Sequence, residues 1–269
     1  MPILIDDDLP TRWMLESDGI FVLDRAAARQ QDLRPLALAV LIGDRDPSAS
    51  GLVRLLSSSP LQLTVDLLRR SDQVGDARLW EAASGQRYDG IVFDAEDGQP
   101  GAIATSPAWD EVRDVLDWAA ESAPCVLISG WAAAASVQHR SGVELSPLDV
   151  PVAGHLPTRI LRRQSFLLRG IDEAWSVPVH QWHRVDPDDL DAIGMVAVAG
   201  LADGQPLVVR NQDRSQVHLF AHPGGIGAAP PGAAWRAGMA LLFANWINFY
   251  LYQPASLGRG TRPALAGAA

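Results

Sequence analysis

Short apolar runs alternate with amphipathic stretches along the first half of the chain. Four of the runs have the length and composition of buried strands: residues 35–43, 61–68, 88–94 and 125–129. The stretches between them have apolar residues at helical spacing: residues 51–59, 76–86 and 108–122. Because strands that alternate with helices form parallel sheets, the pattern predicts an α/β fold with a mostly parallel sheet flanked by helices.

The second half of the chain is richer in β-type patterns. Four segments are typical of strands in an extension or meander: RILRRQSFLLRG (159–170), MVAVAGL (195–201), PLVVRN (206–211) and QVHLFAH (216–222). The long apolar stretch 233–253 predicts a closing helix. We expect residues 1–253 to form a single domain and the Gly- and Pro-rich residues 254–269 to be a disordered tail.

Composition narrows the class of protein. A hydrophobic content of 48% and a charged content of 20% are ordinary for a globular domain, and the net charge of -10 argues against a partner that is nucleic acid. The chain has no Lys, so every fixed positive side chain is an Arg. The single cysteine, Cys125, excludes an internal disulfide and a multi-Cys zinc site. With no apolar run of membrane-spanning length and no signal peptide, we expect a cytoplasmic protein without a membrane partner.

The stretch VLISGWAAAASVQHRSG (126–142) predicts a strand, a sharp turn and an Ala-rich helix. In many α/β enzymes such a turn presents a catalytic Ser or Cys above the sheet. Here the tip falls on Ser129, Gly130 and Trp131. A slip of one residue on a strand turns a side chain to the other face, so we expect Ser129 to point away from the place of the nucleophile.

The segments resemble the homoserine O-succinyltransferase (homoserine O-acyltransferase) family. The stretches that carry the resemblance cover most of residues 1–253: MPILIDDDLP, QDLRPLALAVLI, VRLLSSSPLQLTVDLL, YDGIVF, WDEVRDVLDW, LLRGID, AHP and LLFANWINFYLYQ. The resemblance implies a class I glutamine amidotransferase-like fold with a flavodoxin-like core, and a bacterial-type metabolic role. It also implies acyl transfer from acyl-CoA to the hydroxyl of homoserine through a cysteine thioester.

The resemblance places the family's cysteine at a glycine. Ungapped spacing forward from Trp118 and back from His139 puts the cysteine of the family's His-Ile-Cys-Trp-Gly turn at Gly130, followed by the matching Trp131. Glycine has no side chain to acylate. The family's covalent mechanism therefore cannot use this position.

The family's base corresponds to His222, but its orienting carboxylate corresponds to Gly224. We therefore expect nothing local to fix the imidazole tautomer. The family's Thr-Gly-Ala-Pro-Val-Glu loop, which contributes to the acyl pocket and the oxyanion site, is DAEDGQ here (94–99). Carboxylates in that loop would repel a developing oxyanion. Two segments that normally help to hold the amino acid also differ: Ser-Arg-His-Thr-Glu is HQWHR (180–184), and a long insert is shortened to GGIGAAPPG (224–232).

His222 is the main catalytic candidate, as a general base, with three alternatives: Ser129 as a nucleophile, and Asp94 or Glu96 as a base. Asp94, Glu96 and Asp97 follow a parallel strand, at the edge where open α/β sheets bind ligands. A solvated acidic loop and a site for a cationic group both remain open there.

The substrate-binding candidates lie at the turn, in HQWHR, or at the place of a family Lys that meets the acyl donor: Arg45, Gly130, Trp131, His180, Trp182 and His183. Arg45 could bind a CoA phosphate or a carboxylate in a bidentate manner. His180 and His183 have a spacing that would align them on a helix, but the segment is typical of a loop, and we expect no metal site. Cys125 is expected to be a small buried apolar residue.

Two hypotheses about function remain. The first is a repurposed enzyme that acts on a small amino-acid-like or acyl substrate without a thioester, by direct acyl transfer from acyl-CoA with His222 as base or by another reaction that uses the acidic loop. It needs no resident cofactor, with acyl-CoA as a co-substrate. The second is a non-catalytic descendant that binds a metabolite or another protein chain as its partner. A homodimer is left open in both.

Overall fold

The structure is a computed structural model of the whole chain. It describes residues 3–5, 10–17, 22–23, 34–42, 51–70, 78–95, 100–173, 175–224 and 235–253. Among these residues, the strands form one large mixed sheet in the order β2-β1-β4-β3-β6-β7-β12-β11-β10-β8-β9, with β5 beside β4.

One half of the sheet is parallel. Its strands are β1 (Ile3–Leu4), β2 (Val22–Leu23), β3 (Leu36–Ile42), β4 (Leu63–Arg69), β5 (Arg78–Leu79), β6 (Gly90–Ala95), β7 (Val126–Gly130) and β12 (Gln216–Leu219). The central strands β3, β6 and β7 are buried almost throughout, as expected for strands with helices on both faces. Because these strands are parallel, their carboxyl ends meet at one edge of the sheet.

The other half is antiparallel. Its strands are β8 (Ser146–Ile160), β9 (Ser176–Arg184), β10 (Met195–Leu201) and β11 (Pro206–Asn211). The two halves join where β12 pairs with β7 on one side and with β11 on the other. His222 lies shortly after β12, and its main-chain N–H donates to the carbonyl of Pro178 in β9. This bond holds His222 beside β9, where the candidate site lies.

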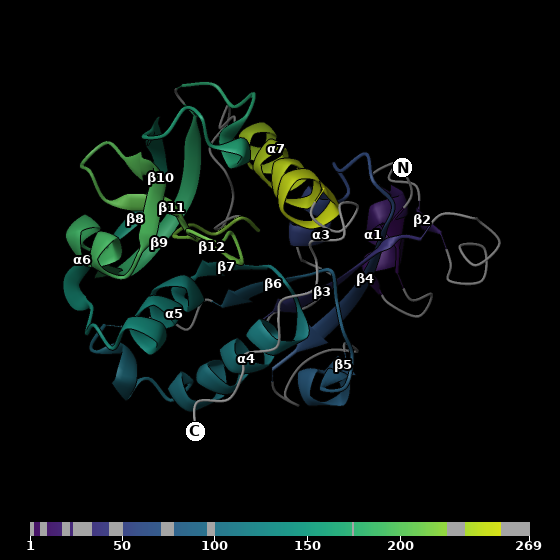
Figure 1. Cartoon of the computed structure of the whole chain (residues 1–269), viewed down its shortest axis with the longest axis horizontal. Helices are drawn as coiled ribbons and strands as arrows, with labels where there is room; N and C mark the ends of the chain where they lie inside the picture. The colour runs from purple at the N-terminus through teal and green to yellow at the C-terminus, as the bar shows by residue number, and fades with distance from the viewer. Residues whose placement is uncertain are drawn as a thin grey trace.

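Helices cover both faces of the sheet (Figure 1). Helices α4 (Trp109–Ser122) and α5 (Trp131–Ser141) share one apolar core with one face. Helix α3 (Gly51–Leu56) and helix α7 (Trp235–Trp246), with the π-helix that continues α7 (Ile247–Tyr252), share a second core with the opposite face. The other described helical elements are short: α1 (Pro10–Ser17), α6 (Pro187–Ala192) and 3-10 turns at Trp80–Ala83, Ile103–Thr105 and Phe166–Leu168.

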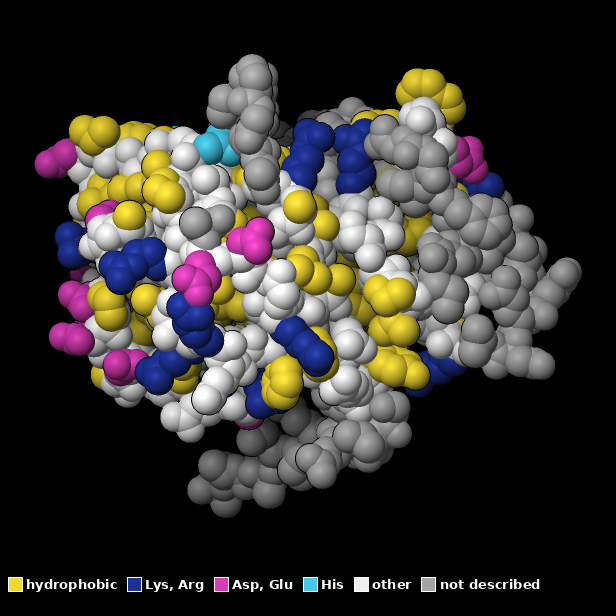
Figure 2. All heavy atoms as spheres, turned by 90° about the horizontal axis from the view of Figure 1, so that it is seen from above, with side chains coloured by type: hydrophobic (Ala, Val, Ile, Leu, Met, Phe, Trp, Pro, Cys, Tyr) yellow, Lys and Arg dark blue, Asp and Glu magenta, His cyan; other side chains and the backbone are white. Residues whose placement is uncertain are grey.

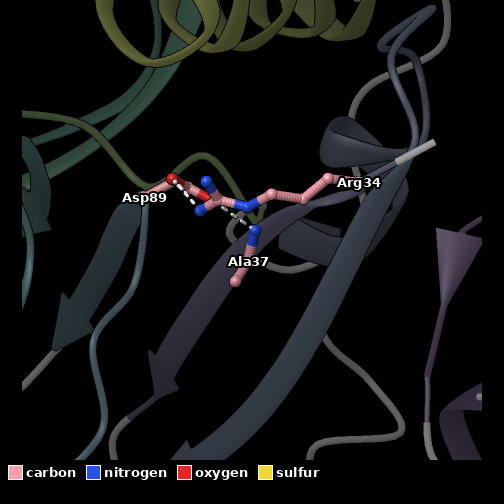
Figure 3. Close-up of polar contacts among 3 residues, drawn as sticks. All are labelled: Arg34, Ala37 and Asp89. Atoms are coloured by element: carbon pink, nitrogen blue, oxygen red, sulfur yellow. Dashed lines mark hydrogen bonds and ion pairs between the residues drawn. The ribbon is translucent and has the colours of Figure 1, made fainter. Parts of the chain in front are cut away.

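A small polar cluster aligns the starts of β3 and β6 (Figure 3). The main-chain N–H of Ala37 donates to Oδ2 of Asp89 at 2.8 Å, and the N–H of Asp89 donates to the carbonyl of Ala37 at 2.7 Å. The exposed guanidinium of Arg34 also donates to the Asp89 carboxylate, at 2.9 Å. Two chain segments about to enter the sheet are thereby tied side by side.

Most of the predicted elements are confirmed, and three predictions are wrong. Residues 76–86 contain no helix of the predicted length in their described part, but the short strand β5 and a 3-10 turn. Residues 159–170 are the last two residues of β8 followed by turns, since this segment leaves the sheet at Ile160. HQWHR is part of β9 rather than a loop. The predicted disordered tail, 254–269, lies outside the described residues.

Candidate functional site

The turn between β7 and α5 has the shape of a strand-to-helix elbow. Strand β7 ends at Gly130 and α5 begins at the next residue, Trp131. Gly130 has φ 66° and ψ -141°, a backbone conformation that a residue with a Cβ adopts only under strain. Its N–H donates to the carbonyl of Ala221 at 3.1 Å, which ties the elbow to the chain that follows β12. The sharp bend predicted from the sequence is therefore present, with glycine at its tip.

The surroundings of Gly130 are close and rich in hydrogen-bond acceptors. A Cβ placed on Gly130 would lie 2.6 Å from the carbonyl oxygen of Ala95, 3.1 Å from Cε1 of His222 and 3.3 Å from Oδ1 of Asp94. The contact with Ala95 involves main chain, so it cannot be relieved by the rotation of a side chain. The end of β6 lies against the elbow at the point where a side chain would begin.

His222 is buried beside this elbow and is held by β9 through two hydrogen bonds. Its N–H donates to the carbonyl of Pro178 at 2.8 Å, and its ring Nε2 lies 3.0 Å from the carbonyl oxygen of His180. Because a carbonyl oxygen only accepts, Nε2 carries the hydrogen, and in the neutral ring the lone pair is on Nδ1. The expectation that nothing local fixes the tautomer is wrong, since a main-chain carbonyl does so.

Gly224, where the resemblance expects a carboxylate, lies against the start of α3. A Cβ placed on Gly51 would be 2.6 Å from the carbonyl oxygen of Gly224. The backbones of Gly51 and Gly224 are therefore in close contact. A side chain on Gly51 would prevent this contact.

Asp94 and Ser129 form a buried pair on adjacent strands. They are register partners in β6 and β7, and the Ser129 hydroxyl donates to Oδ1 of Asp94 at 2.7 Å. Ser129 is fully buried and Asp94 is 4% exposed. Asp94 is thus a strand residue fixed at the elbow rather than part of a solvated loop. The hydroxyl of Ser129 is engaged with this carboxylate.

His180, Trp182 and His183 lie on β9 and line a small cavity of about 10 Å³ together with Gly130 and Trp131. On a strand, residues three apart face opposite sides, so His180 and His183 do not form the aligned pair that a helix would give. The ring of His180 lies near the ring of His222, with 6.2 Å between centroids.

The two β9 histidines have different partners. Nε2 of His183 donates to the carbonyl of Gly101 at 2.8 Å. Burial lowers the pKa of His183, although the bond to Gly101 opposes the shift, and burial together with the neighbouring His222 lowers the pKa of His180. Both rings are therefore neutral at pH 7. No three His, Cys, Asp or Glu side chains gather as a metal-binding group in the described part of the chain.

The remaining candidates fall outside the described residues: Arg45, Glu96 and Asp97. Cys125 is buried immediately before β7, where Nε1 of Trp246 donates to its sulfur at 3.2 Å. Burial raises the pKa of this thiol to about 12, so it is an unreactive core residue at neutral pH. Two groups that shape the site, the carbonyls of His180 and Ala95, had no signal in the sequence because every residue carries a carbonyl.

The surface and the helices add two observations. On the face drawn in Figure 2, Arg side chains lie among acidic and apolar ones rather than in a continuous basic band. None of the described helices has both the length and the apolar character needed to cross a membrane.

The comparison with protein families shows to which family the chain belongs. The sequence model of the family described as homoserine O-succinyltransferase matches residues 2–224. The chain belongs to this family. Similar proteins include the homoserine O-acetyltransferase of Brucella canis, 31% identical over 92% of this chain and 95% of that protein. Another is the homoserine O-acetyltransferase of Novosphingobium aromaticivorans, 28% identical over 92% of this chain and 95% of that protein.

Solved structures support the same fold. A Thermoplasma acidophilum protein assigned as a component of GMP synthase superposes with a TM-score of 0.55 at 13% identity, over 81% of this chain and 99% of that one. The glutamine amidotransferase-like fold predicted for the family is thereby confirmed. Within the homoserine O-succinyltransferase family, this chain has glycine at the tip of its elbow, a carboxylate beside it and a histidine with a fixed tautomer.

Proposed function

We propose that this family member transfers an acyl group from acyl-CoA directly to a small amino-acid-like acceptor, with His222 as the general base and without an acyl-enzyme. The observation that carries the proposal is the position of His222. Its ring lies 3.1 Å from the point where a side chain on residue 130 would begin, and that residue is glycine. On this proposal, His222 acts as a base at an elbow that offers it no thiol to activate.

Direct transfer needs only one chemical step on the protein. The acceptor's nucleophilic atom attacks the thioester carbonyl while His222 takes its proton, the new bond to the acyl carbon forms, and the C–S bond breaks. The CoA thiolate leaves and receives the proton back from the imidazolium. No metal or other cofactor is needed for this balance.

The hydrogen bond from His222 Nε2 to the His180 carbonyl supports the role of a base. It holds the ring in one tautomer and orientation, which is the task of the third member in a Ser-His-Asp arrangement. A neutral carbonyl stabilises the imidazolium less than a carboxylate does. We therefore expect a weaker base than a His–carboxylate pair would give.

Initial-rate kinetics test the proposal. With both substrates varied, direct transfer requires a ternary complex and gives intersecting double-reciprocal lines. An acyl-enzyme gives the parallel lines of a ping-pong mechanism. Acetyl-CoA and succinyl-CoA are the donors to test, with homoserine and related small amino acids as acceptors. Parallel lines would overturn direct transfer.

A second candidate function is favoured by a specific observation. The described cavity at Gly130 has a volume of about 10 Å³, space for roughly one water molecule. A site this small fits a non-catalytic descendant that binds a metabolite or another protein chain elsewhere. Saturable ligand binding without release of CoA, across the same donors and acceptors, would favour this second function.

A further inference from the structure

A second and much larger cavity lies on the segment that joins β8 to β9. Its volume is about 440 Å³, against about 10 Å³ at Gly130, and it is lined by residues of the segment 160–173. Sites for small organic ligands have volumes of about 300–1,000 Å³, so this cavity has room for one. We propose that it binds a small organic anion, with an oxyanion group at its Arg side chains and a flat apolar part against Phe166. The inference does not depend on the proposed acyl transfer.

The main chain around the cavity is fixed by the helix beneath it. The side-chain Nδ2 of Asn245, on α7, donates to the carbonyl of Leu167 at 3.0 Å and to the carbonyl of Arg169 at 2.8 Å. Leu167 and Leu168 are buried in the core that α7 shares with the sheet. Because these contacts already hold the segment, a ligand loses little affinity to the ordering of its site.

The segment carries positive charge in an acidic chain. Residues 159–173 contain four Arg and two carboxylates, whereas the whole chain has a net charge of -10. Arg169 lines the cavity, and its guanidinium lies 5.7 Å from the centre of the Phe249 ring without a carboxylate partner among the described residues. A guanidinium of this kind binds a phosphate or carboxylate group through two parallel hydrogen bonds.

Arg163 supplies a second guanidinium, which is paired with Glu173. The two side chains are 75% and 69% exposed, and an ion pair between exposed side chains contributes little to stability. An oxyanion in the cavity can therefore replace Glu173 as the partner of Arg163 at small cost. Since Glu173 also lines the cavity, its charge opposes the binding of an anion.

The rest of the wall is largely apolar. Ile160, Phe166, Leu168 and Ile171 contribute to it, and the ring of Phe166, 42% exposed, is held by stacking on Phe249 with 5.0 Å between centroids. A purely inorganic anion leaves this wall in contact with water. A ligand that carries its oxyanion on an aromatic ring covers the wall and gains from the apolar surface removed from water.

Phenyl phosphate and benzoate are the probes for the two oxyanions. Inorganic phosphate and acetate lack the ring, and benzyl alcohol lacks the charge. Calorimetric titration of the full chain should show saturable one-to-one binding of an aryl anion, about tenfold or more tighter than that of the ringless anions and of benzyl alcohol. Tighter binding of phenyl phosphate identifies the oxyanion as a phosphate, and tighter binding of benzoate identifies a carboxylate. Binding of neither aryl anion, or equal affinity for the probes without a ring or without a charge, would overturn the inference.

Variants assign the binding to this cavity. Arg163→Gln and Arg169→Gln should each weaken the binding of the aryl anion about tenfold, the scale of one charge-assisted hydrogen bond. Arg113→Gln is the matched control, because Arg113 also has a carboxylate partner, Asp110, at 3.1 Å and an aromatic ring, that of Trp109, at 5.7 Å. Arg113 lies on α4, on the opposite face of the sheet from α7, and its variant should keep the wild-type affinity.

Glu173→Gln should have the opposite effect. It removes the competing carboxylate and frees Arg163, so it should tighten the binding of the aryl anion severalfold, a gain that a loss of folding cannot imitate. Weaker binding by Glu173→Gln, or equal losses in Arg113→Gln and Arg169→Gln, would overturn the inference. Thermal unfolding of each preparation confirms that the compared variants are folded.

Discussion

The carbonyl oxygen of His180 lies 3.0 Å from Nε2 of His222, and this hydrogen bond orients the imidazole at the elbow. The two residues come from segments 42 positions apart, brought together because β9 returns beside the chain that follows β12. A main-chain carbonyl thus orients the His222 ring, whereas the family resemblance suggests that a carboxylate would do so. This bond does not need the side chain of residue 180. It needs the main chain of β9 to pass beside His222.

His222→Ala and His222→Gln should separate the role of the ring in stability from its role in catalysis. Alanine removes the donor to the His180 carbonyl, which should lower the free energy of unfolding by about 1–3 kcal/mol. Glutamine can still donate to that carbonyl and should recover part of the loss. Both lack the base, so both should reduce acyl transfer about 10²- to 10⁴-fold. Urea unfolding and turnover of the same preparations measure the two effects.

If His222→Gln recovered turnover as well as stability, the assignment of His222 as the base would be contradicted. It would mean that the ring only supports the fold. Wild-type turnover in His222→Ala would contradict it as well.

Gly130→Ala should be more destabilising than Gly142→Ala. Gly142, with φ 68° and ψ 4°, is in the left-handed region, where a Cβ costs about 1–2 kcal/mol, whereas Gly130, with φ 66° and ψ -141°, is in a region that a residue with a Cβ adopts at a higher cost. A Cβ on Gly142 meets nothing within 4 Å, whereas a Cβ on Gly130 would lie 2.6 Å from the Ala95 carbonyl oxygen. The difference between the two unfolding free energies therefore measures the overlap together with the costlier backbone conformation at the elbow.

Equal losses in the two variants would contradict both the overlap with the Ala95 carbonyl and the costlier backbone conformation of Gly130. For the same reason as alanine, Gly130→Cys should fold poorly and should not restore homoserine acylation through a thioester. Ready turnover by that single variant would show that the elbow still accepts a nucleophile.

His218 should make the fold sensitive to acid. It is fully buried on β12, with Nε2 beside the hydroxyl of Ser136, and burial, assisted by the charge of Arg140, lowers its pKa to about 3. The unfolded chain has an ordinary His pKa of about 6.5, so between these values the unfolded state binds the extra proton. Stability is therefore lost as the pH falls from about 6.5 toward 3, by up to about 1.4 kcal/mol per pH unit from this group.

His218→Gln removes that titration. Unfolding by urea at about pH 7, 6, 5 and 4, the range over which the unfolded-state imidazole gains its proton, should give a smaller loss of stability in the variant than in wild type. This holds even if the stability of the variant at neutral pH is lower. Parallel pH profiles for the two proteins would contradict the assignment.

The parallel half of the fold could be predicted because its strands are buried on both faces and form continuous apolar runs such as Leu36–Ile42. Strand β8 lacks that signal, since most of its side chains are exposed or half-buried and it contains prolines. HQWHR has polar residues on both faces of β9, so it lacks the alternation of apolar and polar residues that predicts a strand. Helical spacing near Trp80 was overridden by tertiary packing of its ring against Trp118.

The sequence could point to residues of the candidate site, but not to the main-chain contacts that surround them. Gly130, His222 and Asp94 could be found because the resemblance and the strand ends point to them. The approach of the Ala95 carbonyl to the elbow and the bond from His222 to His180 depend on distances between strands, which no local pattern encodes.

Intact-mass spectrometry of the full chain after incubation with acetyl-CoA or succinyl-CoA tests the central claim most directly. Gly130 has no nucleophile, the Ser129 hydroxyl is bound to Asp94, and the Cys125 thiol is buried with a raised pKa. Direct transfer therefore predicts an unchanged protein mass, in the presence and in the absence of an acceptor. A stable acyl increment that forms with the donor, maps to a residue of the site such as Ser129, and disappears when an acceptor is added would contradict it.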